Sequence, residues 1–206
     1  MTDKNIANVS AASARLFRAY YGHCTAPDLD TLFQLLGSIH SLNDRVTKGL
    51  HFNFLNVPEV LALKWLRNFF HHHDELKHTV RLIPITNLPI VSDLVYMCLT
   101  PGELVEEAIK QTAPRHEVQT RAACQQTFHW YGTAVNINPC LFNFVVRAYE
   151  RLAAAGIQIT GGEAEEFRRS YEFESEMGHS HYVDGRLSTP VGNVNDLLSE
   201  IMDCSG

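Results

Sequence analysis

The sequence predicts an all-α protein, a helical bundle over residues 1–156 followed by a C-terminal extension over residues 157–206. Apolar residues recur at helical spacing through most of the chain, and helix-start signals precede several of these segments. Of the 206 residues, 45% are hydrophobic and 19% are charged, which excludes a wholly disordered chain and allows a sizeable core. No apolar run reaches the roughly 18 residues that a membrane span requires.

The first half of the chain contains three predicted helices. The first covers residues 9–22, and the second follows Pro27, has acidic residues in its first turn and extends to about residue 46. The third covers residues 56–80, because Asn56 is a good N-cap and Glu59 follows it three residues later. Its apolar face is wide, so we expect it to lie centrally in the bundle.

The second half begins with residues 82–100, where prolines and β-branched residues predict a loop with one short strand. Helices are expected at 101–111, 115–131 and 138–155, with a tight turn over 136–139. In the extension we expect an acidic helix at 163–175, a loop at 178–192 and a short helix at 194–202.

Charge and cysteine usage restrict the partners and the compartment. The net charge is -6, but residues 1–100 carry nine basic and eight acidic residues, against eight and fifteen in the remainder. An anionic partner should therefore prefer the first half. The five cysteines are odd in number and form no Cys-x-x-Cys pair, which argues against a disulfide framework or a cysteine zinc site. With no recognisable secretory signal, the sequence predicts a cytoplasmic protein.

Residues that can act on a phosphodiester stand together in the third predicted helix. Arg67 is followed directly by Asn68 and, five positions on, by His72. Arginine is permanently charged and forks onto phosphate oxygens, whereas histidine exchanges protons near neutral pH. Attack of a ribose 2′-hydroxyl on phosphorus needs a base, an acid and a positive charge, and these residue types supply all three without a metal. Asn68 can orient a phosphate or cap a local hydrogen bond.

The segment Trp65-Leu66-Arg67-Asn68, followed by His72, resembles the signature of the HEPN superfamily of all-α proteins. The resemblance covers one helix of about 20 residues. It implies a homodimeric, metal-independent endoribonuclease that uses no cofactor and cleaves single-stranded RNA to a 2′,3′-cyclic phosphate and a 5′-hydroxyl. It also implies a role in a toxin–antitoxin or phage-defence system, with an antitoxin or regulatory protein as partner. Family members silenced by nucleotide modification carry a tyrosine two residues after the histidine, where this chain has Asp74.

Helix geometry leaves the identity of the acting histidine open. Arg67 and His72 are about 140° apart around a helix, so they cannot touch within one chain, whereas Arg67 and His71 can. The resemblance implies that a two-fold dimer brings the arginines and histidines of two copies into one cleft. Family spacing favours His72, helical adjacency favours His71, and His73 can substitute or contribute.

Four basic residues flank this segment and are candidates for holding an RNA backbone: Arg45, Lys48, Lys64 and Lys77. Surface solubility explains them equally well. The first alternative function is a non-catalytic, dimeric HEPN-like binding or assembly module, in which the arginine and histidine serve packing. The net charge of -6 is compatible with that interpretation.

Metal chemistry is the second alternative. His73-Asp74 is typical of HD phosphohydrolases, for which His40 or His51 and Asp93 are the further ligand candidates. Glu75-x-x-His78 and Glu176-x-x-His179 match the two motifs of a di-iron bundle, although the second falls beside Gly178 in a predicted loop. His179-x-His181 is more typical of a solvated loop than of a metal site.

Overall fold

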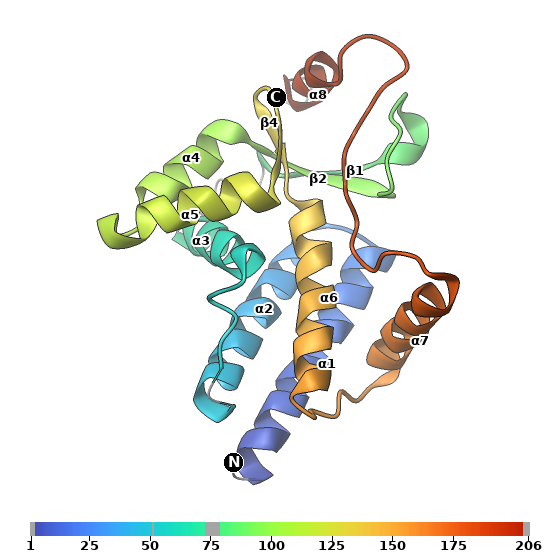
Figure 1. Cartoon of the computed structure of the whole chain (residues 1–206). Helices are drawn as coiled ribbons and strands as arrows, with labels where there is room; N and C mark the ends of the chain where they lie inside the picture. The colour runs from blue at the N-terminus through green and yellow to red at the C-terminus, as the bar shows by residue number, and fades with distance from the viewer. Residues whose placement is uncertain (1–2, 51, 73–78, 204–206) are drawn as a thin grey trace. The chain divides into compact units, whose positions relative to one another are not determined.

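The computed structural model describes residues 3–50, 52–72 and 79–203 (Figure 1). It confirms that the protein is mostly helical, and it also contains one small sheet. The helices are α1 (Asp3–Thr25), α2 (Leu29–Gly49), α3 (Pro58–His72), α4 (Gly102–Lys110), α5 (Pro114–Thr127), α6 (Asn138–Ala154), α7 (Gly162–Met177) and α8 (Val194–Asp203). The strands are β1 (Arg81–Pro84), β2 (Tyr96–Pro101), β3 (His129–Tyr131) and β4 (Ala134–Asn136). None of the described helices has the length and apolarity to cross a bilayer.

The chain divides into two compact units, each built from two separate stretches of sequence. Unit 1 comprises residues 1–60 and 143–182, and unit 2 comprises residues 61–142 and 183–206. The boundary expected after residue 156 falls in the connection between α6 and α7, in unit 1. Helices α3 and α6 each begin in one unit and continue into the other.

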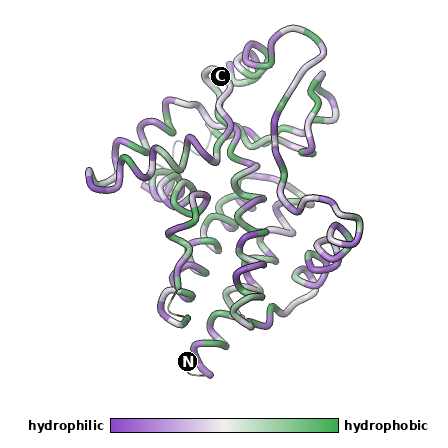
Figure 2. Tube along the Cα trace, viewed as in Figure 1, coloured by the Kyte–Doolittle hydropathy of each residue, from purple (hydrophilic) through white to green (hydrophobic). Residues whose placement is uncertain are grey.

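Unit 1 is held together by α1, which packs against both α2 and α7. Asp28 begins α2 with a capping box, in which its carboxylate accepts a hydrogen bond from the Thr31 backbone N–H at 2.7 Å. On the α7 side, the Phe167 ring lies 5.0 Å from the ring of Phe17 and 5.9 Å from that of Tyr20. Green and purple stretches alternate along the helices in Figure 2, as expected of amphipathic helices with one buried face.

Unit 2 contains an antiparallel sheet in the order β1-β2-β4-β3, which the sequence did not predict beyond one short strand. The segment 82–100, expected as a loop with one short strand, contains most of two paired strands, β1 and β2, and most of β2 is buried. The helix expected over 115–131 ends at Thr127, because the residues after it turn back in a two-residue hairpin. Gly132, at φ 59°, supplies the left-handed conformation that this hairpin requires.

Two further boundaries differ from the prediction. Asn136 ends a strand rather than a turn, and its side chain accepts hydrogen bonds from the backbone N–H groups of Cys98 and Asn138, at 3.1 and 3.2 Å. Helix α3 begins at Pro58, and Val80 at its predicted end is not helical. The carboxylate of Glu59 binds Arg147 of α6 at 2.7 Å, which is a tertiary contact that a capping-box pattern does not reveal.

We expect unit 1 to lose stability in mild acid through His23. This imidazole on α1 is buried, with Nδ1 3.0 Å from the hydroxyl of Thr31. Burial lowers the pKa of His23 from 6.5 to about 4, although the nearby Asp28 carboxylate opposes the shift. The unfolded chain therefore binds a proton that the folded chain rejects. Protonation of His23 therefore does not lower the free energy of unfolding above about pH 6.5. As the pH falls from 6.5 toward 4, this free energy declines by up to about 3 kcal/mol.

Urea unfolding of the wild type and of His23→Gln at pH 7 and pH 4.5 checks this expectation. The variant should lose less stability between the two pH values than the wild type, and His40→Gln, which alters a partly exposed histidine of α2, should behave as the wild type. Equal losses in the wild type and His23→Gln would show that another group controls the acid sensitivity.

Candidate functional site

Four of the predicted catalytic residues lie on one face of α3, in the part of the helix that belongs to unit 2: Arg67, Asn68, His71 and His72. At 100° per residue they fall within an arc of about 140°. The opposite face is buried, which fixes the rotation of the helix and turns the polar residues outward; it comprises Ala62, Leu63, Leu66, Phe69 and Phe70. The outward set is called the α3 stripe below and comprises Lys64, Arg67, Asn68, His71 and His72.

Arg67 is half-buried, and it forms no ion pair with a carboxylate of the described residues. One guanidinium nitrogen, Nη1, donates a hydrogen bond to Asn68 Oδ1 at 3.1 Å. By contrast, six other arginines pair with acidic side chains: Arg18, Arg121, Arg147, Arg168, Arg169 and Arg186. Arg67 therefore retains donors for an external anion, and Asn68 fixes the orientation of the guanidinium.

The two described histidines of the motif, His71 and His72, are exposed in the last turn of α3. Their ring centroids are 5.6 Å apart, with an interplanar angle of 63°. Because both rings are exposed, an external substrate can reach them. Across the described part of the chain, no hydrogen bond joins Arg67 to either ring. His73 lies outside the described residues, so the identity of the acting histidine remains a prediction.

Of the four candidate RNA-binding residues, the structure places one in the α3 stripe. Lys64 stands one turn before Asn68, and its Nζ lies 5.4 Å from the centre of the Trp65 ring. Arg45 and Lys48 are exposed on α2, in unit 1. Lys77 lies outside the described residues.

The residues proposed for an HD-type metal site have other contacts or lie outside the description. His40 Nε2 lies 3.8 Å from Asp44 on the same helix. The Asp93 carboxylate accepts the backbone N–H groups of Asp184 and Gly185, at 2.7 and 2.9 Å, and so fixes a loop of unit 2. His51, His73 and Asp74 are not among the described residues.

Glu176 and His179, the second di-iron motif, are exposed at the C-terminal end of α7. The nearby His179-x-His181 pair is a separate pattern, and its second histidine has other contacts. His181 is held there: Nδ1 lies 2.8 Å from Glu174, Nε2 lies 3.0 Å from the Ser175 hydroxyl, and the ring stacks on Tyr171 at 3.6 Å. Both ring nitrogens are thus engaged in closing the α7 C-terminus. The first motif, Glu75 to His78, lies outside the described residues. Within residues 3–50, 52–72 and 79–203, no three His, Cys, Asp or Glu side chains are grouped to hold a metal ion.

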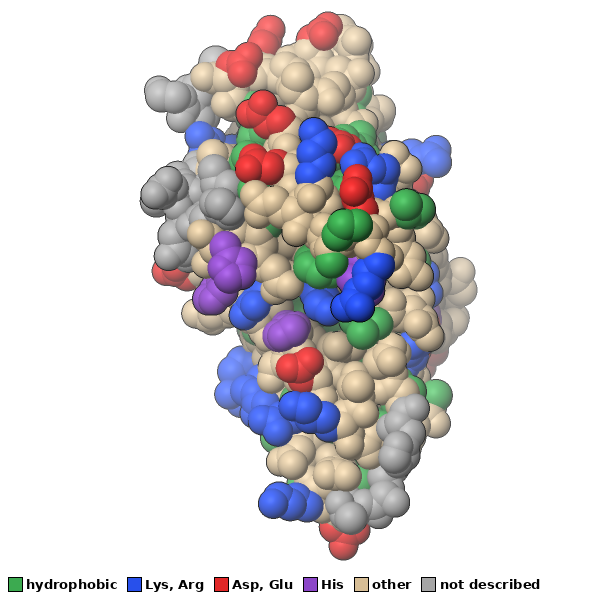
Figure 3. All heavy atoms as spheres, turned by 90° about the vertical axis from the view of Figure 1, so that its left-hand side faces the viewer, with side chains coloured by type: hydrophobic (Ala, Val, Ile, Leu, Met, Phe, Trp, Pro, Cys, Tyr) green, Lys and Arg blue, Asp and Glu red, His purple; other side chains and the backbone are tan. Residues whose placement is uncertain are grey.

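Sequence reasoning missed two basic residues that lie beside α3. Arg115 and His116 stand in the first turn of α5, and the His116 ring is 6.1 Å from that of Trp65. The sequence contains a signal for Arg115, because the first turn of a helix favours acidic residues and disfavours cations. A cation there is unfavourable for the helix alone and indicates another role. Figure 3 looks onto the side where α4 and α5 lie in Figure 1, and histidine, lysine and arginine side chains are exposed on it.

Comparison with family models, with curated proteins and with solved structures finds no significant match. Membership of the HEPN superfamily stays a prediction from the sequence motif in α3.

Proposed function

We propose that the α3 stripe is one half of the active site of a homodimeric, HEPN-like, metal-independent endoribonuclease. The observation that supports this most directly is the environment of Arg67. Its guanidinium has no carboxylate partner in the described residues, is oriented by Asn68 and stands one turn before two exposed imidazoles. Cleavage of a phosphodiester requires a base, an acid and a positive charge, and the arginine and histidines of two such faces can supply them.

The reaction follows from these groups. The imidazole of His72, or of His71, takes the proton of a ribose 2′-hydroxyl as the 2′-oxygen bonds to the adjacent phosphorus. Arg67 stabilises the charge that develops on the non-bridging oxygens of the phosphorane. The bond from phosphorus to the 5′-oxygen then breaks, and a second, protonated imidazole supplies the proton to that oxygen. The products are a 2′,3′-cyclic phosphate and a 5′-hydroxyl.

A second copy of the chain completes this arrangement. The 140° between Arg67 and His72 prevents one helix from directing both side chains at one phosphate. Two α3 helices facing each other across a two-fold axis would supply two arginines and two acid–base groups to a shared cleft. We place the enzyme in the cytoplasm, where its cysteines would remain reduced.

The purified protein should cleave single-stranded RNA in the presence of EDTA, because none of the proposed groups needs a divalent cation. A fluorescently labelled RNA of mixed sequence, resolved on a denaturing gel, measures the cleavage, and mass spectrometry of the products identifies the cyclic phosphate ends. Activity that disappears with EDTA and returns with added metal would favour the HD-type alternative. RNA binding without cleavage would favour the non-catalytic binding module.

A further inference from the structure

We propose that a basic cluster beside the α3 stripe holds the phosphate backbone of the single-stranded RNA. The cluster comprises Lys64 and Trp65 of α3 together with Arg115 and His116 of α5, and it is called the α3–α5 cluster below. All four residues belong to unit 2. The identity of the ligand as RNA rests on the proposed function, whereas the existence of the cluster rests on its own contacts.

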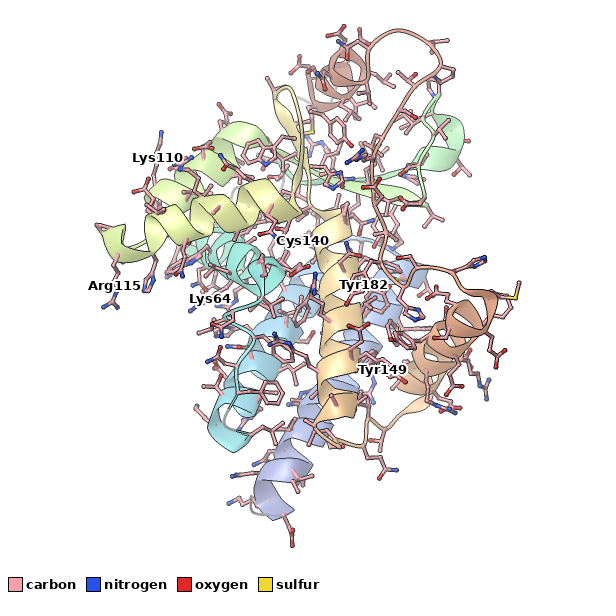
Figure 4. All side chains as sticks on the ribbon, in the orientation of Figure 1. Lys64, Lys110, Arg115, Cys140, Tyr149 and Tyr182 are labelled. Carbon is pink, nitrogen blue, oxygen red and sulfur yellow. The ribbon has the colours of Figure 1, made fainter. Side chains whose placement is uncertain are left out.

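The four side chains form an unbroken series of contacts around the Trp65 indole. Lys64 Nζ lies 5.4 Å from the centre of the indole, and the His116 ring lies 6.1 Å from it at an interplanar angle of 37°. Arg115 Nε donates a hydrogen bond to His116 Nε2 at 3.1 Å. Figure 4 shows Lys64 on α3 and Arg115 at the outer end of α5. The indole and the imidazole thus bring two cations from separate helices to one surface.

The positive charge of the α3–α5 cluster is not neutralised by the acidic residues near it in the chain. In the described structure, no carboxylate forms an ion pair with Lys64 or Arg115. The carboxylates of Glu106 and Glu117 are engaged by Arg121, at 2.6 and 3.4 Å. Arg115 also stands at the positive end of the α5 dipole, so side chain and helix attract the same anion.

The position of the cluster favours RNA over an acidic protein as the ligand. Lys64 is part of both the cluster and the α3 stripe. At 1.5 Å per residue, Arg67 lies about 4.5 Å and His72 about 12 Å further along the helix axis. A polyanion with regularly spaced phosphates can contact Arg115, Lys64 and Arg67 in succession and reach the histidines. The carboxylates of an acidic protein have no such regular spacing.

The test is RNA binding by the double variant Lys64→Ala/Arg115→Ala. The RNA probe carries 2′-O-methyl groups, which cannot attack phosphorus, so it remains intact with this variant and its controls. The anisotropy of a fluorescein-labelled single-stranded RNA is measured in EDTA over a range of salt concentrations. We expect the dissociation constant to rise roughly tenfold. The salt slope should decrease by about 1.4, because each phosphate that is no longer neutralised lowers the slope by about 0.7.

A matched control removes one lysine and one arginine from other parts of unit 2. Lys110→Ala alters a lysine that lies apart from Lys64 and Arg115 in Figure 4, and Arg186→Ala alters an exposed arginine already 3.3 Å from Asp184. This double variant should bind RNA within about twofold of the wild type, with an unchanged salt slope. An equal loss in both double variants would show diffuse attraction and overturn the inference.

Other outcomes separate the inference from the proposed function. If the cluster variant loses binding while the wild type does not cleave RNA in EDTA, the cluster is supported and the nuclease proposal fails. If the wild type cleaves RNA and the cluster substitutions change neither binding nor cleavage, the nuclease proposal stands and the cluster is overturned. Polyglutamate that competes as well as RNA would assign the surface to an acidic protein and also overturn the inference.

Discussion

Arg67→Ala and His72→Ala should each reduce RNA cleavage by about a hundredfold or more. Loss of a positioned acid–base group costs about two to four orders of magnitude, and loss of a donor to a developing oxyanion costs about two to three. The folded state should be almost unaffected, because His72 is exposed and Arg67 has its hydrogen bond with its neighbour Asn68. Initial rates in EDTA, with thermal unfolding of the same preparations, measure both effects.

Matched controls are available elsewhere in the chain. Arg186→Ala removes an exposed arginine and His40→Ala removes a partly exposed histidine, and both variants should retain wild-type rates. Melting temperatures of the two catalytic variants should lie within about 2 °C of the wild type. A collapse of the fold in Arg67→Ala would instead assign the arginine to packing. His71→Ala and His73→Ala, compared with His72→Ala, identify the acting histidine.

The shared cleft can be examined with the same variants. Mixed dimers of Arg67→Ala and His72→Ala chains contain one intact arginine and one intact His72, so mixing two inactive proteins should restore part of the activity. Sedimentation of the wild type should give twice the 23.2 kDa chain mass. A monomer that cleaves RNA at full rate would contradict the two-fold arrangement.

Arg147→Ala should destabilise unit 1 by about 2 kcal/mol, because a buried carboxylate loses a guanidinium that is itself 44% exposed and screened by water. The carboxylate of Glu59 is buried, with 5% of the residue exposed, and Arg147 Nε donates to it at 2.7 Å. Removal of the arginine leaves a buried charge without this partner, which is more costly than the net value of the pair. The guanidinium also stacks over the Tyr182 ring at 5.1 Å, and the substitution removes this cation–π interaction as well.

Urea unfolding at pH 7 measures the destabilisation, and a second variant tests its cause. Glu59→Gln/Arg147→Ala has no buried charge, so it should be more stable than Arg147→Ala alone. Arg169→Ala, which removes an exposed ion pair on α7, should cost less than about 1 kcal/mol. A destabilisation below about 1 kcal/mol in Arg147→Ala would show that water replaces the arginine.

The helices could be predicted because their signals are local. Asp28 caps α2 and glycines follow α6 and α7, and these features act within a few residues of the helix ends. The sheet depends on contacts between distant residues. Thr100 pairs with Val135, and strands β3 and β4 have three residues each, which is too short for an alternating pattern to stand out.

The candidate site likewise has a part that local sequence signals predict and a part that depends on distant contacts. Arg67, Asn68, His71 and His72 share the accessible face of one helix, and helical periodicity placed them there. Arg115 approaches the same surface from α5, about 50 residues later in the chain, through contacts that no spacing rule encodes. The choice among the three histidines also depends on a neighbouring molecule and not on the local sequence.

The alternation of the chain between its two units has a consequence for synthesis on the ribosome. Helix α1 is translated well before α7, yet Phe17 of α1 packs against Phe167 of α7. The apolar residues of α1 that face α7 therefore stay exposed on the nascent chain until α7 has been translated, and chaperones that bind such segments should associate with it. Truncation after residue 142 should yield an aggregating product.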